Sequence, residues 1–232
     1  MILFYTHEIS DTTAILEQDE YHHCCKVLRH KEGDTINITD GKGTKATAII
    51  EKVSKREALL TITEQQFVEQ TESEIILAIA PPKNRSRWEW LIEKSVEIGV
   101  TEIIPLVTAR SERQKTNQER SQKIMRSAAL QSLRPYHPSI GPGMTFKSIM
   151  DNDNYTDKTG FLASYSPGNS HLLDYRSKVT KALVMIGPEG DFTSEEIAMA
   201  QENGMTTVNI STSRLRTETA AIVAVTLLAK NG

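Results

Sequence analysis

The sequence has few cysteines and no pattern that would bind zinc. Cys24 and Cys25 are its only cysteines and are adjacent, so they cannot crosslink distant parts of the chain. We expect two reduced, partly buried thiols, which are typical of a reducing compartment. His22 and His23 precede them, but consecutive residues of a helix point in different directions and no second pair of ligands follows. The sequence therefore predicts no metal site.

Long apolar runs are also absent. No run approaches the roughly 20 apolar residues that a membrane span needs. The N-terminal stretch MILFYTHEIS lacks the basic region and the long apolar region of a secretion signal. Hydrophobic residues make up 38% and charged residues 25% of the chain, a balance typical of soluble globular proteins. We expect a cytoplasmic protein that makes no membrane contact.

The chain has no overall excess of positive charge, since its formal net charge is −3. Within residues 83–134, however, eleven Lys or Arg stand against six Glu. Such a segment can neutralise phosphates if its cations share one face, although charged helix faces are often only solvated. Charge alone leaves both interpretations open.

Residues 1–68 are predicted to form a small, mostly β domain with one helix. Asp19 can cap a helix through the sequence YHHCCKVLR, in which Val27 and Leu28 are expected to face the core. Asp40-Gly41 favours a hairpin turn, because both residues tolerate positive φ. The expected strands are Ile2–Tyr5, Thr35–Thr39, Thr44–Val53 and Ala58–Phe67.

After a polar linker at Gln65–Glu74, strands and helices alternate, which predicts a mostly parallel α/β domain over residues 73–232. Three helices should begin at a capping box, in which Ser or Thr stands three residues before Glu. The three boxes are Ser86 with Glu89, Thr116 with Glu119, and Thr193 with Glu196. The expected strands are Ile75–Ala80, Ile103–Val107, Phe161–Tyr165, Ala182–Ile186 and Thr207–Ile210.

Two of the predicted helices have distinctive apolar patterns. The helix that starts near Ser86 has a stripe at helical spacing that is typical of a core face. This stripe consists of Trp88, Leu91, Ile92, Ser95 and Val96. The last helix, Thr217–Lys230, is apolar around nearly its whole circumference and must be covered on every side. One sheet face cannot cover it, which favours a helix threaded into the domain or a subunit interface.

Two loops in the C-terminal part each follow a predicted strand. Gly187-Pro188-Glu189-Gly190 follows the first strand, and a turn rich in hydroxyls and arginine, 211–216, follows the second. Such loops form the ligand crevice in open α/β sheets, and glycine allows close backbone approach. By itself, Gly-Pro-Glu-Gly is more typical of a plain connection. No Gly-x-Gly-x-x-Gly sequence follows any strand, which disfavours a dinucleotide site.

Four separated motifs resemble one family, the bacterial small-subunit rRNA uracil-N3 methyltransferases of the knotted SPOUT class. Ile186–Gly190 and the sequence LRTETA at 215–220 match the two strongest family motifs. The family usually has a glycine near Ser211 and an arginine near Ser213, whereas this chain has serines there and an arginine at Arg214. The other matching segments are Val27-Leu28-Arg29 with Gly33-Asp34 and Asp40-Gly41-Lys42-Gly43, and RWEWLIEKSVEIGVTEIIPLVTARSE from residue 87.

The resemblance implies a SPOUT-type trefoil-knotted α/β methyltransferase domain over 73–232, preceded by a PUA-like β-barrel domain over 1–68 that helps to hold rRNA. It implies an S-adenosyl-L-methionine-dependent enzyme that methylates N3 of a specific uridine, uracil 1498, in the 16S rRNA of the small ribosomal subunit. It also implies a homodimer packed through the C-terminal region.

The resemblance further implies roles for individual residues. Arg216 is expected to orient the uracil or to stabilise charge on its oxygens, and Glu218 or Glu189 to accept the N3 proton. The cofactor is expected to lie across residues 162–164, 187–190 and 210–215. The residues expected to bind it are Leu162, Ala163, Ser164, Gly187, Pro188, Glu189, Gly190, Ile210, Ser211 and Leu215. The expected RNA-binding residues are Lys26, Arg29, Lys83, Arg85, Arg87 and Arg134, of which Arg134 could equally be a favourable cation at a helix C-terminus.

Methyl transfer to a ring nitrogen is an in-line displacement that needs no metal and no covalent cysteine, only close positioning of methyl donor and nucleophile. Two other functions stay open at this point. One is a non-catalytic RNA-binding assembly factor that has kept the shape without the cofactor. The other is a SPOUT enzyme that acts on tRNA or large-subunit rRNA, since a fold does not fix its substrate.

Overall fold

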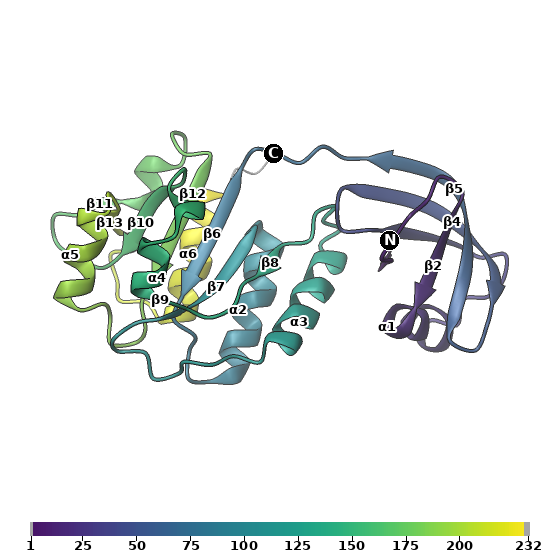
Figure 1. Cartoon of the computed structure of the whole chain (residues 1–232), viewed down its shortest axis with the longest axis horizontal. Helices are drawn as coiled ribbons and strands as arrows, with labels where there is room; N and C mark the ends of the chain where they lie inside the picture. Colours follow the sequence, from purple (N-terminus) through teal and green to yellow (C-terminus); the bar gives the residue numbers. More distant parts are fainter. Residues whose placement is uncertain (1, 230–232) are drawn as a thin grey trace. The chain divides into compact units, whose positions relative to one another are not determined.

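A computed structural model describes residues 2–229, which form two compact units (Figure 1). The first unit contains the chain up to Gln70 together with Ala129–His137. The second contains Thr71–Ala128 and the chain from Pro138 onward. Lys230, the expected last residue of the final helix, lies outside the described residues. No helix within 2–229 is long and apolar enough to cross a membrane.

The first unit is built on a five-stranded sheet in the order β1-β3-β4-β5-β2. Its pairs are antiparallel, apart from the parallel pair of β1 and β3. Register shifts between Thr47 and Ala48 and between Ile50 and Lys52 bend the long β4–β5 pair, so the sheet can curl around its core. The strands are β1 (Leu3–Tyr5), β2 (Thr13–Glu17), β3 (Thr35–Thr39), β4 (Thr44–Val53) and β5 (Glu57–Phe67).

The predicted hairpin turn between β3 and β4 is confirmed. The Asp40 carboxylate accepts hydrogen bonds from the backbone N–H groups of Lys42 and Thr44. Gly41 and Gly43 have φ values of +68° and +107°, which favour glycine. Strand β2 was not predicted, because its five residues lie between short polar segments and give little periodic signal.

The helix of the first unit differs from its prediction. Helix α1 (Gln18–Tyr21) continues into the π-helical turn η1 (His22–Val27), and its cap position is Glu17, so the predicted cap at Asp19 is wrong. Val27 and Leu28 are 57% and 37% exposed, so their predicted place in the core is also wrong. Tyr21 and Cys24 face the core. The wider π-helical turn rotates the residues after Cys24 away from the positions that regular α-helical spacing would give them, and the turn ends before Leu28.

The two cysteines are free, as predicted. Cys24 is fully buried and Cys25 is half-buried. Burial and the neighbouring Cys25 raise the pKa of the Cys24 thiol to about 12. A thiol that stays protonated is a poor nucleophile, which agrees with a structural role for Cys24.

The segment Ala129–His137 completes the first unit against the hairpin turn. Gly43 N–H donates to the carbonyl oxygen of Pro135 at 3.0 Å, and His137 N–H donates to that of Gly41 at 2.9 Å. The Tyr136 hydroxyl donates to the carbonyl oxygen of Val68 at 2.8 Å. These long-range contacts were not predictable from local sequence.

The second unit contains a parallel sheet in the order β11-β13-β10-β12-β6-β7-β8, with β9 also paired to β7. Every pair described in it is parallel, which confirms the predicted α/β class. Strand β6 begins at Glu74 and β5 ends at Phe67, so the linker is shorter than predicted. The strands are β6 (Glu74–Ile79), β7 (Glu102–Val107), β8 (Ser139–Ile140), β9 (Met144–Thr145), β10 (Thr159–Ala163), β11 (Ser170–His171), β12 (Lys181–Ile186) and β13 (Thr206–Asn209).

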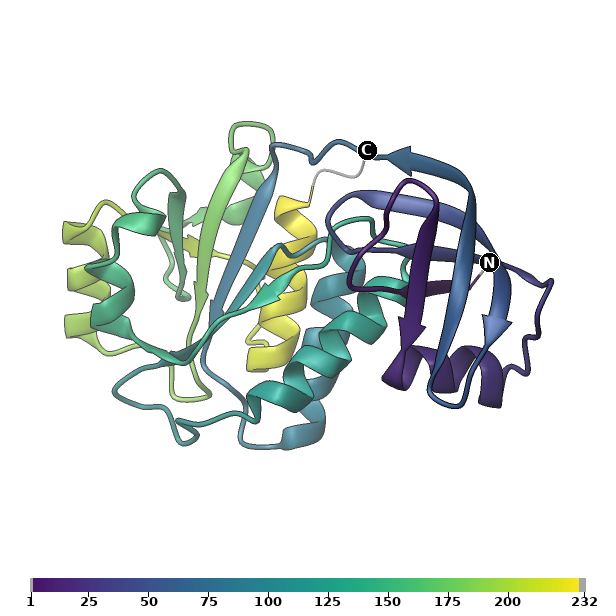
Figure 2. The same ribbon diagram turned by 45° about the vertical axis from the view of Figure 1, so that its right-hand side comes forward.

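Helices cover both faces of this sheet (Figure 2). Helix α6 (Thr217–Leu228) contacts β6, β12 and helix α2 (Arg85–Ile98) on one face. Helices α4 (Phe146–Met150) and α5 (Ser194–Glu202) pack on the other face over a core that includes Leu162, Leu183 and Met185. The remaining helices are α3 (Gln118–Gln131), η2 (Asp153–Tyr155) and η3 (Leu172–Tyr175). All five residues of the stripe predicted on α2 are buried.

Two of the three predicted capping boxes are wrong. Helix α2 is capped by Asn84, whose side chain accepts from Ser86 N–H and Arg87 N–H. At α3 the Asn117 side chain accepts from Arg120 N–H. In both cases an asparagine stands directly before the first turn, where its oxygen reaches the free N–H groups. The box of Thr193 and Glu196 at α5 is confirmed.

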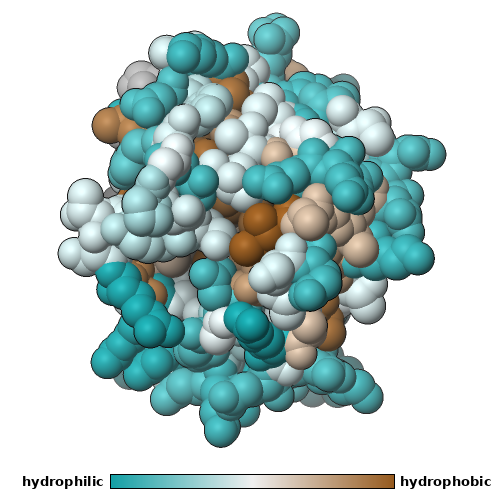
Figure 3. All heavy atoms as spheres, turned by 90° about the vertical axis from the view of Figure 1, so that its left-hand side faces the viewer, coloured by the Kyte–Doolittle hydropathy of each residue, from teal (hydrophilic) through white to brown (hydrophobic). Residues whose placement is uncertain are grey.

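Near its C-terminus the chain leaves β12, forms β13 on the far side of β10, and returns as α6 to β6, β12 and α2. The sequence favours a helix threaded into the domain or a subunit interface, and α6 packs within the domain against α2 and the sheet. The sheet ends at β11, which has only two residues, and the face at that end is mostly hydrophilic (Figure 3). A short, polar edge of this kind discourages pairing with another sheet.

Candidate functional site

A cavity of about 570 Å³ lies in the second unit at the carboxyl ends of three neighbouring strands. Strands β12 and β13 both pair with β10, so the loops that follow all three meet at one edge of the sheet. The start of α6 completes the wall. The volume lies in the range of small-molecule sites.

Most of the predicted cofactor-binding residues line this cavity. They come from the end of β10, the loop after β12 and the turn after β13, so tertiary structure brings together three segments that are separate in sequence. These residues are Ala163, Ser164, Gly187, Pro188, Glu189, Ile210, Ser211 and Leu215. Arg216, the residue expected to act on the base, lines it as well.

Two predicted cofactor-binding residues are not in the cavity wall. Leu162 is fully buried in the core beneath α4 and α5. Successive residues of a strand face opposite sides, so Leu162 and its neighbour Ala163 cannot both face the cavity. Gly190 is turned outward, and its carbonyl oxygen accepts a hydrogen bond from Arg110 at 2.7 Å.

Other residues line the cavity as well. Thr212, Ser213 and Arg214 fall within the stretch 210–215 that the resemblance places against the cofactor. Asp191 follows the glycine loop directly and has a φ of +60°, which is unusual for a residue other than glycine. Only the fold shows that the others, Tyr165, Ile186, Val208, Thr217 and Ala220, reach the same cavity.

Strand β10 ends two residues earlier than predicted, which places Ser164 and Tyr165 in the cavity loop. The Ser164 hydroxyl donates to the Asp191 carboxylate at 3.3 Å. The other Asp191 oxygen accepts from Phe192 N–H at 2.7 Å. These bonds hold a carboxylate in the wall between two of the three loops.

Two arginines hold the backbone of the glycine loop. Arg214 donates to the carbonyl oxygen of Glu189 at 3.0 Å. Arg110 donates to the carbonyl oxygens of Gly190 at 2.7 Å and Phe192 at 3.2 Å. Because these carbonyl oxygens are already hydrogen-bonded to the two arginines, the loop has its conformation before any ligand binds.

Gly187 packs closely against the side chain of Phe192. A Cβ atom there would lie 3.1 Å from a ring carbon of Phe192, which is closer than most real contacts of Cβ. The Phe192 ring is itself buried and packs edge-on against Phe146 on α4. Gly187 therefore lets the loop lie directly on the core.

Glu218 does not line the cavity, although its neighbours Arg216 and Thr217 do. Its side chain turns toward α2, and one oxygen lies 3.4 Å from Arg87 Nε. Within residues 2–229 the other oxygen is buried and has no hydrogen-bond partner. Arg87, predicted to bind RNA, is thus engaged with the residue that was predicted to act in catalysis.

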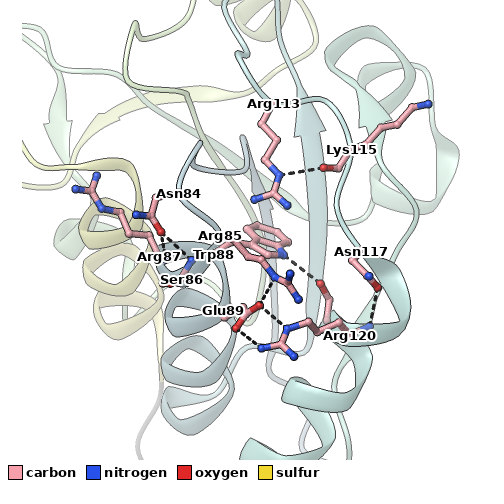
Figure 4. Close-up of polar contacts among 11 residues, drawn as sticks. Asn84, Arg85, Ser86, Arg87, Trp88, Glu89, Arg113, Lys115, Asn117 and Arg120 are labelled. Atoms are coloured by element: carbon pink, nitrogen blue, oxygen red, sulfur yellow. Dashed lines mark hydrogen bonds and ion pairs between the residues drawn. The ribbon is translucent and has the colours of Figure 1, made fainter.

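The other predicted RNA-binding residues of the second unit lie on the surface. Lys83 pairs with Glu112 at 3.0 Å, and Arg85 pairs with Glu89 at 2.7 Å. Glu89 also pairs with Arg120, as Figure 4 shows. Two arginines share one carboxylate there, which leaves a surplus of positive charge on the surface.

In the first unit, Lys26 and Arg29 are exposed. The Lys26 ammonium lies 5.4 Å from the centre of the Tyr21 ring. Arg29 has a φ of +62°. Arg134 is half-buried, and burial lowers the pKa of its guanidinium.

The cavity offers backbone groups, small residues, hydroxyls and the exposed guanidinium groups of Arg214 and Arg216. The part of the chain that the structure describes contains no group of three His, Cys, Asp or Glu that could hold a metal ion. Family models match both parts of the chain: an RNA methyltransferase domain at residues 69–229 and an RNA methyltransferase PUA domain at 16–63. By class the chain is an RNA methyltransferase.

Individual relatives define the family more closely. Ribosomal RNA small subunit methyltransferase E of Bacillus subtilis is 29% identical over 229 residues, which cover 93% of this chain and 89% of that protein. The same-named protein of Synechocystis is 30% identical, with 94% of this chain and 73% of that protein covered. The chain belongs to the ribosomal RNA small subunit methyltransferase E family.

Solved structures agree with this assignment. A probable rRNA-methyltransferase from Porphyromonas gingivalis is 34% identical, with a TM-score of 0.88 over 97% of this chain and 95% of that chain. The methyltransferase E of Neisseria gonorrhoeae, solved bound to S-adenosyl methionine, is 30% identical, with a TM-score of 0.86 over 97% of this chain and 95% of that one. The predicted SPOUT domain with a PUA-like barrel is therefore confirmed.

Proposed function

We propose that this protein is a 16S rRNA methyltransferase that uses S-adenosyl-L-methionine and that its target is N3 of one uridine, uracil 1498. The observation that carries the proposal is the cavity formed by the loops after β10, β12 and β13, which brings both strongest family motifs to one place. A relative that is 30% identical over nearly the whole chain was solved with this cofactor bound.

The residues present fit such a cofactor. The cavity has the volume of a small-molecule site, and glycine at position 187 allows the loop to approach closely. When bound, S-adenosyl-L-methionine supplies the electrophilic methyl group. The Ser164 and Ser211 hydroxyls and the loop backbone would hold it, and the preformed loops would fix its orientation.

Arg216 is proposed to act on the reacting base. Its side chain lines the cavity and makes no capping hydrogen bond at the start of α6. A guanidinium there can donate to the uracil oxygens as N3 loses its proton, which stabilises the developing charge. Of the two carboxylates expected to take that proton, Glu189 lines the cavity and Glu218 does not, which favours Glu189.

The RNA is proposed to contact both units. Lys26 and Arg29 are exposed cations in the barrel, and Lys83, Arg85 and Arg120 are exposed cations of the second unit. Contacts of this kind position a backbone without reading its sequence. The substrate is proposed to be 16S rRNA or the small subunit that contains it, and the protein is proposed to act in the cytoplasm.

The protein is proposed to act as a homodimer that packs through α6. This helix buries one side against α2 and the sheet, but the side chains of Ile222, Val223 and Leu227 are only half-buried. A second copy would cover this apolar side by the same surface, as symmetric dimers do.

Methylation in vitro tests the proposed function. Small subunits from a strain without the enzyme are incubated with the purified protein and S-adenosyl-L-methionine carrying a labelled methyl group, and the rRNA is mapped by mass spectrometry. We expect one added methyl group on N3 of one uridine of 16S rRNA. Label in tRNA or large-subunit rRNA instead would identify a different substrate. Calorimetry with S-adenosyl-L-methionine would support a non-catalytic assembly factor if no binding heat is found.

A further inference from the structure

An ion pair joins α2 to the first turn of α6. Arg87 Nε lies 3.4 Å from one carboxylate oxygen of Glu218. The side chain of Glu218 is 9% exposed and that of Arg87 is 39% exposed. The pair therefore joins a buried anion to a cation that reaches the surface.

Glu218 depends on this pair. Its second oxygen is buried and has no hydrogen-bond partner within the described residues. A buried carboxylate is costly unless it is paired, and the α6 N-terminus offsets only part of that cost. Without Arg87 the buried Glu218 carboxylate would have no cation to pair with. The first turn of α6 would then shift or loosen so that the carboxylate could reach water.

The Arg87 side chain is separate from the surface cluster on the same helix. Figure 4 shows Arg87 pointing away from Glu89 and Arg120, while Arg85 turns toward them. Arg85 and Arg120 share Glu89. Two arginines only two positions apart on α2 thus have different partners and, we expect, different roles.

The first turn of α6 also sets the position of Arg216. Arg216 is the cap residue of α6, and its carbonyl oxygen accepts the first helical hydrogen bond, from Ala220 N–H at 2.8 Å. Arg216 and Thr217 face the cavity, while Glu218 faces α2. Whatever fixes Glu218 therefore fixes the backbone from which the Arg216 side chain extends.

We propose that Arg87 and Glu218 form a positioning pair for Arg216, and that neither Arg87 binds RNA nor Glu218 accepts the uracil proton. The proposal rests on the proposed methyl transfer. The pair holds the start of α6 in place, so that the Arg216 guanidinium contacts the base in one orientation. A displacement of about 1 Å at such a position can lower a rate by about 100-fold.

Four variants test the pair: Arg87→Met, Arg87→Lys, Glu218→Gln and the double variant Arg87→Met with Glu218→Gln. Arg85→Met is the matched control for the exchange measurement alone, because it removes an exposed arginine from the same helix and Arg85 is itself proposed to contact RNA. For each, kcat, the KM for small subunits, cofactor affinity by calorimetry and the melting temperature are measured. Hydrogen exchange at the first turn of α6 is followed as a readout that does not depend on activity.

For Arg87→Met we expect kcat to fall by about 100-fold, while the KM for RNA and the cofactor affinity change by less than about threefold. Arg87→Lys should recover part of kcat, because a cation is restored. The double variant should be no slower than the worse single variant, since the two residues act as one unit. Exchange at the first turn of α6 should speed up in Arg87→Met and stay unchanged in Arg85→Met.

Three results would overturn the proposal that Arg87 and Glu218 position Arg216. One is a raised KM for RNA with unchanged kcat in Arg87→Met, which would make Arg87 an RNA contact. Another is loss of kcat in Glu218→Gln with full activity in Arg87→Met, which would make Glu218 the proton acceptor. The third is unchanged exchange at the first turn of α6 in Arg87→Met. If the wild-type protein does not methylate small subunits, the proposed function fails. The exchange measurement still shows whether Arg87 and Glu218 hold the first turn of α6.

Discussion

The guanidinium of Arg214 donates a hydrogen bond of 3.0 Å to the carbonyl oxygen of Glu189 and so joins two of the three loops of the cavity, those after β12 and β13. The family resemblance places an arginine near Ser213, whereas this chain has an arginine at Arg214. Arg214 lines the same cavity as Ser213, so this chain retains a guanidinium in that wall.

Arg214→Met should weaken the binding of S-adenosyl-L-methionine by about fivefold, because an intramolecular hydrogen bond contributes about 1 kcal/mol net. Calorimetry measures the affinity. Arg56→Met, which removes an exposed arginine of the first unit, is the control and should bind as the wild type does. Equal affinity in Arg214→Met and the wild type would show that the loops hold their positions without this bond.

Arg216→Ala should abolish methylation and leave cofactor affinity within about tenfold of the wild type, because the guanidinium stabilises charge that develops only during the reaction. Single-turnover rates and calorimetry on the same preparation separate the two effects. If the variant transfers methyl groups at the wild-type rate, Arg216 does not act on the base.

Gly43→Ala should lower the free energy of unfolding by about 3 kcal/mol, from strain at positive φ and from overpacking. Its φ is +107°, and an added Cβ would collide with the Tyr136 hydroxyl and lie 2.9 Å from the carbonyl oxygen of Val68. Gly33→Ala is the control, because Gly33 has a φ of +92° with open space around it. It should cost about 1 kcal/mol, from strain alone.

Urea unfolding followed by circular dichroism measures both glycine variants. The double variant Gly43→Ala with Tyr136→Ala should lose less than the sum of its single variants, since removing the ring relieves the collision. Equal losses in Gly43→Ala and Gly33→Ala would mean that Tyr136 does not restrict this turn.

Acid should weaken the cluster on α2. Hydrogen bonds from Arg120 and then Arg85 lower the pKa of the Glu89 carboxyl from 4.5 to about 2. Since the folded pKa is the lower one, the stabilisation is complete above the unfolded value and is lost as pH falls through the folded value. The melting temperature of the wild type should exceed that of Glu89→Gln at neutral pH, and the gap should shrink between about pH 5 and about pH 2. A gap that stays constant over this range would contradict the shift.

Local sequence signals predicted the elements better than their boundaries. The stripe on α2, the hairpin turn and the capping box of α5 were correct, because each depends on residues a few positions apart. The caps of α2 and α3 were wrong because Ser86 and Thr116 also fit the pattern, and only the backbone path decides which residue stands before the first turn.

The candidate site was predictable in outline. Both loops were found from their motifs. The sequence could not tell which of Leu162 and Ala163 faces the cavity, because the alternation along a strand shows only that the two face opposite sides. Tyr165 gave no signal at all. It reaches the cavity only because β10 ends before it.

By itself the sequence determined the family, the alternation of strands and helices, and the two loops that carry the chemistry, since these follow from short motifs and local periodicity. Only the tertiary structure decided which side chains those loops share. Arg87 and Glu218 are far apart in the chain, and their pairing follows from the packing of α6 on α2. Contacts between distant segments depend on how elements pack, and no local pattern encodes that choice.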